Sequence, residues 1–208
     1  MQPKKRPDCP HCNSASLALE RSLKETENFR VVCDVHPLTE GHLLIIPKQH
    51  ISCMGAFSKT LFVEFDKLYQ LFSRFISRTY GSVSSFEHGI IGQTVFHAHV
   101  HVLPYHGQSE TIIPEDKDKL TSIQDLTEVK NAFRREDKYL VFSIADSFWL
   151  VDTHLGVPRF FRDRFAQALG HPERGNWKQM RENKTLMQQA SVEITKVKTK
   201  WSKFLTNQ

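Results

Sequence analysis

The sequence has few cysteines and no long apolar run. It contains four cysteines in 208 residues, all within the first 53 positions, which argues against the disulfide-rich framework of a small secreted domain. The longest apolar stretches, such as residues 43–47 and 139–144, have the length of a strand rather than of a membrane span. Residues 1–8 are polar and lack the apolar core of a signal peptide. We therefore expect a cytoplasmic protein with no membrane span.

The charge balance is mildly basic and narrows the choice of partner only slightly. Lysine and arginine total 28 against 23 aspartate and glutamate, a formal net charge of +5. A positive potential suits a nucleotide substrate as well as it suits a nucleic acid, so charge alone does not separate these partners. The basic run of residues 4–6 is typical of a solvated terminus rather than of a DNA-binding arm.

Three histidines stand at alternate positions within residues 94–104: His97, His99 and His101. In an extended strand their side chains share one face, about 6.6 Å apart from neighbour to neighbour, which leaves room for one phosphoryl group among them. Histidine acts as nucleophile, acid or metal ligand near neutral pH. A solvated strand face or a metal patch would be the plainer interpretations, but the row favours phosphoryl chemistry.

A second motif, Cys9-Pro-His-Cys12, allows three interpretations. A redox dithiol of the thioredoxin type should open a helix directly after a strand, and only eight largely polar residues precede Cys9. Two thiolates from a tight turn, with two imidazoles from elsewhere, would instead make a closed tetrahedral zinc site of the structural kind. Chance is the third possibility.

Hydrophobic patterning predicts an α+β order in the first half. Residues 29–34 and 42–47 read as a hairpin of strands, with turn residues between them. Residues 57–80 carry apolar side chains at three- and four-residue spacing, which predicts an amphipathic helix packed on the sheet. Residues 82–91 are expected to form a loop leading into a short strand, and residues 94–103 the histidine strand.

The composition changes after residue 107. Residues 109–138 are rich in charged and small polar side chains and are expected to form a connector with a surface helix around residues 120–133. Residues 139–144 and 148–152 then read as a second hairpin. The second half is therefore predicted to be a mixed α/β extension.

Two further helices are predicted near the C-terminus. One is opened by Pro158 and ends near Gly170. The other carries an apolar stripe over residues 187–204, which we expect to pack on the protein's own body rather than to form a dimer helix. We divide the chain into residues 1–108 and an extension, residues 109–208, docked on the first half or on a dimer.

Residues 92–104 resemble the His-x-His-x-His-x-x signature of the histidine triad (HIT) superfamily of nucleotide hydrolases and transferases. The resemblance extends upstream, since Asp34 is followed eight residues later by His42 and then by the strand and turn of residues 43–50. Together these motifs cover roughly residues 9–105. The resemblance implies an α+β fold, with a HIT-like antiparallel sheet and packed helices.

The resemblance also implies roles for the histidines. His99, the middle histidine of the motif, matches the family's nucleophile, which forms a nucleotidyl-histidine intermediate that water then releases. A backbone carbonyl of the same strand is the expected acceptor that orients it. His101 and His42 are expected beside the phosphoryl group, where donors stabilise charge on its oxygens.

Four other positions are candidates for substrate binding. Asp34 matches the residue that receives the ribose hydroxyls, Thr94 a small polar position near the leaving group, and Gln93 a residue able to contact the phosphate. The chain departs from the family where many relatives have an amide that touches the phosphates. Glu87 falls nearest to that position, and His88 follows it. An unpaired acid there would repel a polyphosphate, which puts the substrate in question.

In some HIT proteins, zinc is held by a Cys-x-x-Cys pair, the histidine after the Pro-Lys turn and the first histidine of the triad. The matching residues are Cys9, Cys12, His50 and His97. The resemblance thus favours a structural zinc that leaves the other histidines of the triad free for chemistry. No organic cofactor is expected.

The third histidine of the motif selects a branch of the superfamily. Transferase relatives commonly have glutamine at the position of His101, so the resemblance implies a hydrolase. A dinucleoside polyphosphate substrate is favoured, with phosphoramidate hydrolysis or a nucleotide-binding regulatory module of little turnover as alternatives. A homodimer is expected because dimers are common in the superfamily. Nucleic acid is an unlikely partner, since relatives acting on DNA ends carry a later zinc finger and no cysteine follows Cys53.

Overall fold

The two apolar stretches on either side of Pro37 and Gly41 form the predicted hairpin. In the computed structural model, which describes residues 6–207, these stretches are β2 (Phe29–Cys33) and β3 (Leu43–Pro47). They pair antiparallel along their whole length. Gly41 lies in the left-handed region with φ of 95°, which explains why glycine is needed where the chain turns back into β3.

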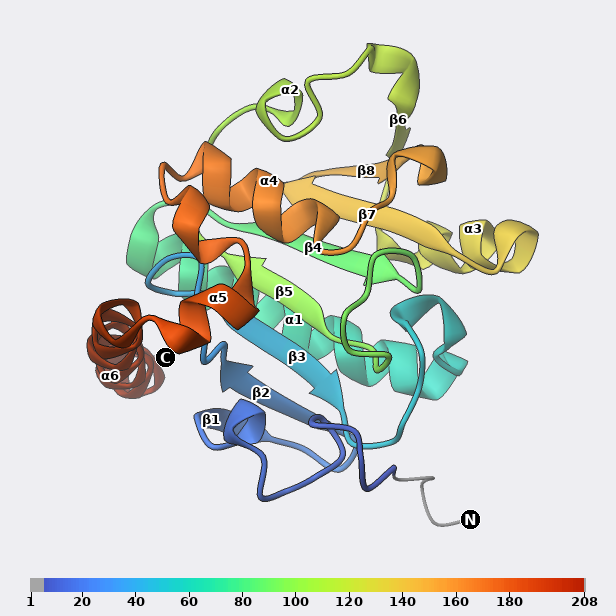
Figure 1. Ribbon diagram of the computed structural model, residues 1–208. Coiled ribbons are helices and arrows are strands. Elements are labelled where there is room, and N and C mark those ends of the chain that lie inside the picture. The colour runs from blue at the N-terminus through green and yellow to red at the C-terminus, as the bar shows by residue number, and fades with distance from the viewer. Residues whose placement is uncertain (1–5, 208) are drawn as a thin grey trace.

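The hairpin belongs to an antiparallel sheet of eight strands (Figure 1). The strand order is β1-β2-β3-β5-β4-β7-β8-β6. The remaining strands are β1 (Ser22–Glu25), β4 (Ser84–Gly89), β5 (Val100–Leu103), β6 (Leu120–Ile123), β7 (Tyr139–Ile144) and β8 (Ser147–Val151). The structure is thus an α+β fold with an antiparallel sheet, as predicted.

One face of the sheet is covered by α1 (Lys59–Tyr80), the predicted amphipathic helix. Its first turn is capped by the Ser58 hydroxyl, and it ends at Gly81 with φ of 84°. The apolar side chains of its buried stripe, including Phe72 and Phe75, are fully enclosed. The burial of this stripe against the sheet is the main force that holds the helix in place.

The opposite face carries α4 (Phe160–Ala168) and α5 (Trp177–Glu182), which lie in front of the sheet in Figure 1 while α1 lies behind it. Phe161 and Phe165 of α4 pack on Phe86 of β4. Their ring centroids lie 5.5 and 5.1 Å, respectively, from the centroid of the Phe86 ring. The second half of the chain therefore covers the face on which the histidines lie.

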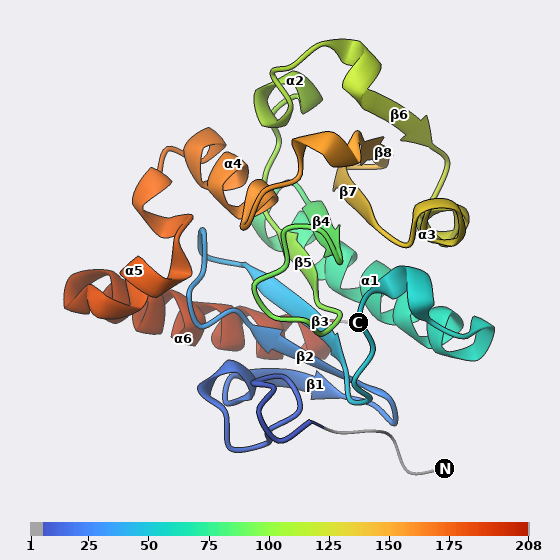
Figure 2. The ribbon, with the colours of Figure 1, turned by 45° about the vertical axis from the view of Figure 1, so that its right-hand side comes forward.

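The last helix, α6 (Lys184–Thr206), packs on its own body as predicted. The Trp201 ring stacks on Phe72 with centroids 4.5 Å apart, and its indole N–H donates to the Leu23 carbonyl at 3.1 Å. Figure 2 shows α6 passing behind β2 after the short α5. Among the described residues, no helix has both the length and the apolarity to cross a membrane.

The two halves of the chain share one sheet. β7 pairs with β4 along the whole of that strand, from Ser84 opposite Ile144 to Gly89 opposite Tyr139. Without β7, the backbone groups along this side of β4 would be an open edge. The segment after residue 108 thus continues the sheet that the first half begins.

The structure corrects two predicted elements. The histidine strand begins only at Val100, because the His97 N–H turns back to Val95 and the Ala98 N–H bonds to Ile51 instead of joining the ladder. The surface helix expected over residues 120–133 is wrong at its start: β6 comes first, because residues 120–123 pair with β8, and the helix begins only at Val129.

The shorter elements are α2 (Ser109–Ile112), α3 (Val129–Glu136) and 3-10 turns at Leu17–Leu19, Met54–Ala56, Lys117–Lys119, Leu126–Glu128, Thr153–Leu155 and Pro172–Arg174.

Candidate active site and metal centre

The imidazole of His99 is held in one orientation by the backbone just before it. Its Nδ1 lies 2.6 Å from the carbonyl oxygen of His97, so Nδ1 carries the proton and donates it. Burial lowers the pKa of His99, which keeps the ring neutral. In this tautomer Nε2 presents a lone pair, and His99 lines a cavity of about 540 Å³. The geometry is that of a neutral nitrogen nucleophile.

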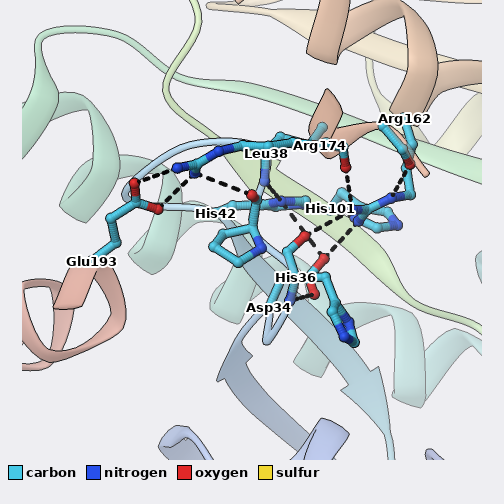
Figure 3. Close-up of polar contacts among 10 residues, drawn as sticks. Asp34, His36, Leu38, His42, His101, Arg162, Arg174 and Glu193 are labelled. Carbon is cyan, nitrogen blue, oxygen red and sulfur yellow. Dashed lines mark hydrogen bonds and ion pairs between the residues drawn. The ribbon is translucent and has the colours of Figure 1, made fainter. Parts of the chain in front are cut away.

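His42 and His101 belong to a chain of hydrogen bonds that begins at the backbone of Leu38 (Figure 3). The Leu38 N–H donates to His42 Nδ1 at 3.1 Å, so His42 carries its proton on Nε2 and donates it to His101 Nδ1 at 2.8 Å. Burial lowers the pKa of His42 to about 3 and that of His101 well below its usual value. His101 Nε2 then bears a hydrogen, buried and without a partner among residues 6–207. His101 lines the same cavity, so this donor is available for a ligand.

Asp34 accepts from two directions. Its Oδ1 receives the His36 N–H at 2.9 Å, and its Oδ2 receives the Arg162 guanidinium at 2.8 Å. Burial by itself would raise the pKa of Asp34, but Arg162 and His42 outweigh it and lower the pKa to about 2. The carboxylate is therefore ionised and paired where it borders the cavity.

Arg162 ties the second half of the chain to this turn. Besides Asp34, its guanidinium donates to the carbonyls of His36 at 2.7 Å, Gly175 at 3.2 Å and Arg174 at 3.3 Å. Figure 3 shows Arg162 and Arg174 reaching the turn after β2 from opposite sides. The pairing of Arg162 with Asp34 joins positions 128 residues apart, so no local pattern in the sequence indicates it.

The cavity is walled by three parts of the chain that are distant in the sequence. One wall is the N-terminal segment of residues 10–21, a second is the histidine face of the sheet, and a third is α5 with the start of α6. The third wall includes Trp177 and Arg181. The extension therefore completes the pocket in which His99 lies.

Thr94, expected near the leaving group, and Gln93, expected to contact the phosphate, are placed differently. Thr94 lines the cavity, and its Oγ1 accepts the Trp177 indole N–H at 3.1 Å. Gln93 turns away from the cavity, since its side-chain amide donates to the Ser52 carbonyl at 2.8 Å. Gln93 thus fixes the loop that contains Ser52 and does not face the histidines.

Glu87 is not part of the cavity, contrary to the expectation from sequence. Its carboxylate lies on the α1 face of the sheet, where it accepts from the Met54 N–H at 2.9 Å and from the Tyr139 hydroxyl. Burial raises its pKa to about 7. Because side chains alternate along a strand, His88 takes the histidine face instead, where its Nε2 accepts the Phe161 N–H at 3.0 Å.

The four predicted metal ligands converge at one point. One ligand atom from each of Cys9, Cys12, His50 and His97 lies within 4.8 Å of all the others. Cys9 Sγ and Cys12 Sγ each lie 3.4 Å from His97 Nδ1, and Cys12 Sγ lies 3.4 Å from His50 Nδ1. Zinc bonds of about 2.3 Å to sulfur and 2.0 Å to nitrogen place such atoms about 3.5 Å apart in a tetrahedron. The arrangement fits zinc.

His97 connects this cluster to the nucleophile. Its Nε2–H donates to the Pro47 carbonyl at 2.8 Å, which leaves Nδ1 as the ligand atom facing the cysteines. The backbone carbonyl of His97 accepts the hydrogen bond from the ring Nδ1–H of His99. A displacement of His97 would therefore move the group that orients His99.

His11 is a residue at the site that the sequence analysis did not single out. It lies between the two cysteines, is buried, and lines the cavity. Its ring is edge-on to that of His99, with centroids 4.9 Å apart. The Pro-His pair inside the cysteine motif was the available signal, and the tight turn of that motif is what brings His11 to the active site.

Comparison with known proteins matches the same half of the chain. The family model for the HIT domain matches residues 19–108. An uncharacterized HIT-like protein of Borreliella burgdorferi is 32% identical over 105 residues, which cover 47% of this chain and 75% of that protein. The protein named Hit of Bacillus subtilis is 28% identical over 90 residues, covering 41% of this chain and 62% of that one.

Among solved structures, a hypothetical histidine triad nucleotide-binding protein from Sulfolobus tokodaii is 28% identical, with a TM-score of 0.41. The match covers 48% of this chain and 71% of that one. The chain belongs to the HIT family, a superfamily of nucleotide-binding proteins and hydrolases.

Proposed function

We propose that this protein is a nucleotide hydrolase in which His99 attacks the α-phosphate. The observation that carries the proposal is the bond from His99 Nδ1 to the His97 carbonyl, which leaves Nε2 as a lone pair in the cavity. Nε2 forms a bond to phosphorus while the bond to the leaving oxygen breaks, and the leaving group departs with that electron pair. Water then attacks phosphorus, the electron pair of the P–N bond returns to Nε2, the attacking water gives up one proton to solvent, and neutral His99 is restored.

His101 and His42 stabilise charge during both displacements. His101 Nε2–H is the unpartnered donor beside His99, and we assign it to a non-bridging oxygen of the attacked phosphate. His42 holds the tautomer of His101 through their 2.8 Å bond. Because burial lowers the pKa of His42 to about 3 and that of His101 well below its usual value, the two residues donate hydrogen bonds as neutral rings.

Asp34 is the proposed ribose contact. A carboxylate has about four acceptor positions, and the contacts with His36 and Arg162 use one on each oxygen. The remaining positions can receive the two ribose hydroxyls, while Arg162 keeps the carboxylate ionised and fixed. Thr94 is the proposed polar contact on the leaving-group side, whereas Gln93 and Glu87 act from outside the cavity.

Zinc is the proposed metal of the Cys9, Cys12, His50 and His97 cluster, and its role is structural. When bound, zinc would cross-link the N-terminal segment, which carries the two cysteines, to His50 and His97, and it would take no part in the chemistry on the substrate. The four ligands complete a tetrahedron with no open position. His97 then transmits this rigidity to His99 through its carbonyl.

The favoured substrate is a dinucleoside polyphosphate, with a nucleoside phosphoramidate as the alternative. The test is to incubate the protein with a panel of adenine and guanine dinucleotides, phosphoramidates and nucleotidyl sugars and to separate the products. Replacement of His99 by Asn should reduce turnover by several orders of magnitude while nucleotide binding and folding persist. Near-normal turnover in that variant would reject the mechanism, and stoichiometric binding without product would favour a regulatory module.

A cytoplasmic homodimer remains the expected assembly. β4 is already paired with β7 of the same chain, so a second copy would need another surface, for example the edge strand β1 or β6. Light scattering after size-exclusion chromatography distinguishes a dimer from a monomer of 24.1 kDa.

A further inference from the structure

The charges that line the cavity are unevenly matched. Three arginines line it, namely Arg21, Arg162 and Arg181, but only two carboxylates do, Glu20 and Asp34. Arg21 pairs with Glu20 at 3.4 Å, and Arg162 pairs with Asp34 at 2.8 Å. Arg181 makes no ion pair with any residue in the described range 6–207. One positive charge on the cavity wall is thus left for a ligand.

The Thr94 hydroxyl, which lines the same cavity as Arg181, is oriented to donate a hydrogen bond. The indole N–H of Trp177 can only donate, and it does so to Thr94 Oγ1 at 3.1 Å. Thr94 therefore keeps its own proton for another acceptor. Arg181 lies one helical turn after Trp177, with its guanidinium carbon 5.9 Å from the Trp177 ring. An arginine and a hydroxyl donor consequently face the same cavity as His99 and His101.

We propose that Arg181 and Thr94, with Trp177 as the residue that positions Thr94, form a subsite for the phosphates beyond the attacked phosphorus. The subsite is specific for substrates whose leaving group is itself an anionic phosphate chain. This inference rests on the proposed function for the place of the attacked phosphorus, but the subsite can be tested by binding alone. Two of its residues come from α5, which lies outside the matched residues 19–108.

Arginine suits this role because its planar guanidinium donates two parallel hydrogen bonds to phosphate oxygens. Arg162 cannot donate two parallel bonds to a phosphate, since four of its five N–H groups already serve Asp34 and three carbonyls. The subsite also explains how a pocket with an ionised Asp34 tolerates a polyphosphate: the extension supplies the charge that offsets repulsion.

The test measures binding of AMP and ATP by calorimetry in His99→Asn protein, which prevents turnover. ATP should bind about tenfold or more tightly than AMP, and Arg181→Gln should bring the ratio close to one. Lys184→Gln removes the same charge from a nearby exposed residue that does not line the cavity and should preserve the ratio. An unchanged ratio in Arg181→Gln, or an equal loss in Lys184→Gln, would overturn the subsite.

A second arm examines Trp177 through a double-mutant cycle. Trp177→Phe removes the N–H but keeps a ring, and Thr94→Ala removes the hydroxyl. If Trp177 acts through Thr94, the ATP-to-AMP ratio in the double variant should equal that in Thr94→Ala alone. Additive losses would show that Trp177 does not position Thr94 and would overturn that part of the proposal.

Turnover separates this inference from the proposed function. If the wild-type protein hydrolyses no substrate of the panel, yet the ATP-to-AMP ratio falls only in Arg181→Gln, the subsite stands and the hydrolase is rejected. If the protein is active, Arg181→Gln should lower kcat/KM about tenfold or more for a dinucleoside polyphosphate and leave a phosphoramidate with a neutral amine leaving group much less affected. Equal losses for both substrates would overturn the subsite.

Discussion

Arg162 in α4 donates to Asp34, which directly follows β2, over a distance of 2.8 Å, and both side chains are buried. The pair joins the extension to the turn that borders the active site. The same guanidinium also donates to the carbonyl of His36, in the turn after β2, and to that of Gly175, just before α5. The contact therefore fixes α5, which walls the cavity, relative to the histidines.

Replacement of Arg162 by Gln should lower the free energy of unfolding by about 3–5 kcal/mol, since it leaves the buried Asp34 charge without its cationic partner. Urea denaturation at pH 7 measures the loss. Arg159→Gln is the control: its i,i+4 ion pair with Asp163 is partly exposed to solvent and should contribute less than about 1 kcal/mol. Similar small losses in both variants would contradict the role of the Arg162 pair.

The pH dependence of stability should carry opposite contributions from two buried acids. The pKa of Asp34 is lowered to about 2 in the folded protein. The stability that ionised Asp34 contributes is therefore complete above its pKa in the unfolded chain, about 3.9, and is lost as the pH falls from about 4 to about 2. The pKa of Glu87 is raised to about 7, so its stabilising contribution is full below about 4.3 and is lost as pH rises to about 7.

Glu87→Gln isolates the second contribution. The amide oxygen can still accept from Met54 and the amide N–H₂ can donate to Tyr139, as the protonated acid would. At pH 8 the variant should therefore be more stable than wild type, by up to about 3 kcal/mol, with little difference at pH 4. Denaturant melts at both pH values measure this. A difference that does not change between pH 4 and 8 would show that Glu87 does not titrate as described.

The metal prediction concerns the cluster of cysteines and histidines. Purified protein should contain about one zinc per chain by mass spectrometry, and Cys9→Ser or His50→Ala should lose the zinc together with thermal stability. Cys53→Ser changes a buried cysteine outside the cluster and should keep the zinc. Protein that is free of metal and equally stable would exclude a structural zinc site.

Truncation after Gly107 should expose apolar surface and the open side of β4. We expect lower solubility, measured by the soluble fraction on expression, and a change in substrate preference larger than the change in attack by His99. The comparison uses the substrate panel on the full chain and the truncated one. A soluble fragment with unchanged activity across the panel would mean that the extension has a separate role.

Local patterns in the sequence were enough for much of the fold and for the core of the candidate site. The period of three to four apolar residues predicted α1 and α6, and alternating or continuous apolar runs predicted both hairpins. The alternate histidines resemble the HIT signature, and that resemblance made His99 the candidate nucleophile, although the strand proved shorter than expected. The spacing of Cys9 and Cys12 pointed to metal, and the fold brings both next to two histidines.

What the sequence by itself determined is therefore local: where most of the helices and strands lie, and which motifs mark the candidate site. The tertiary structure alone decided which distant residues share a surface. The Arg162–Asp34 pair and the contact of Trp177 with Thr94 depend on how α4 and α5 cross the sheet, and β4–β7 pairing depends on a strand that begins 50 residues later. Glu87 shows the reason most simply. Alternation along β4 places it opposite His88, but only packing against Met54 and Tyr139 decides which face is the interior and which is the active site.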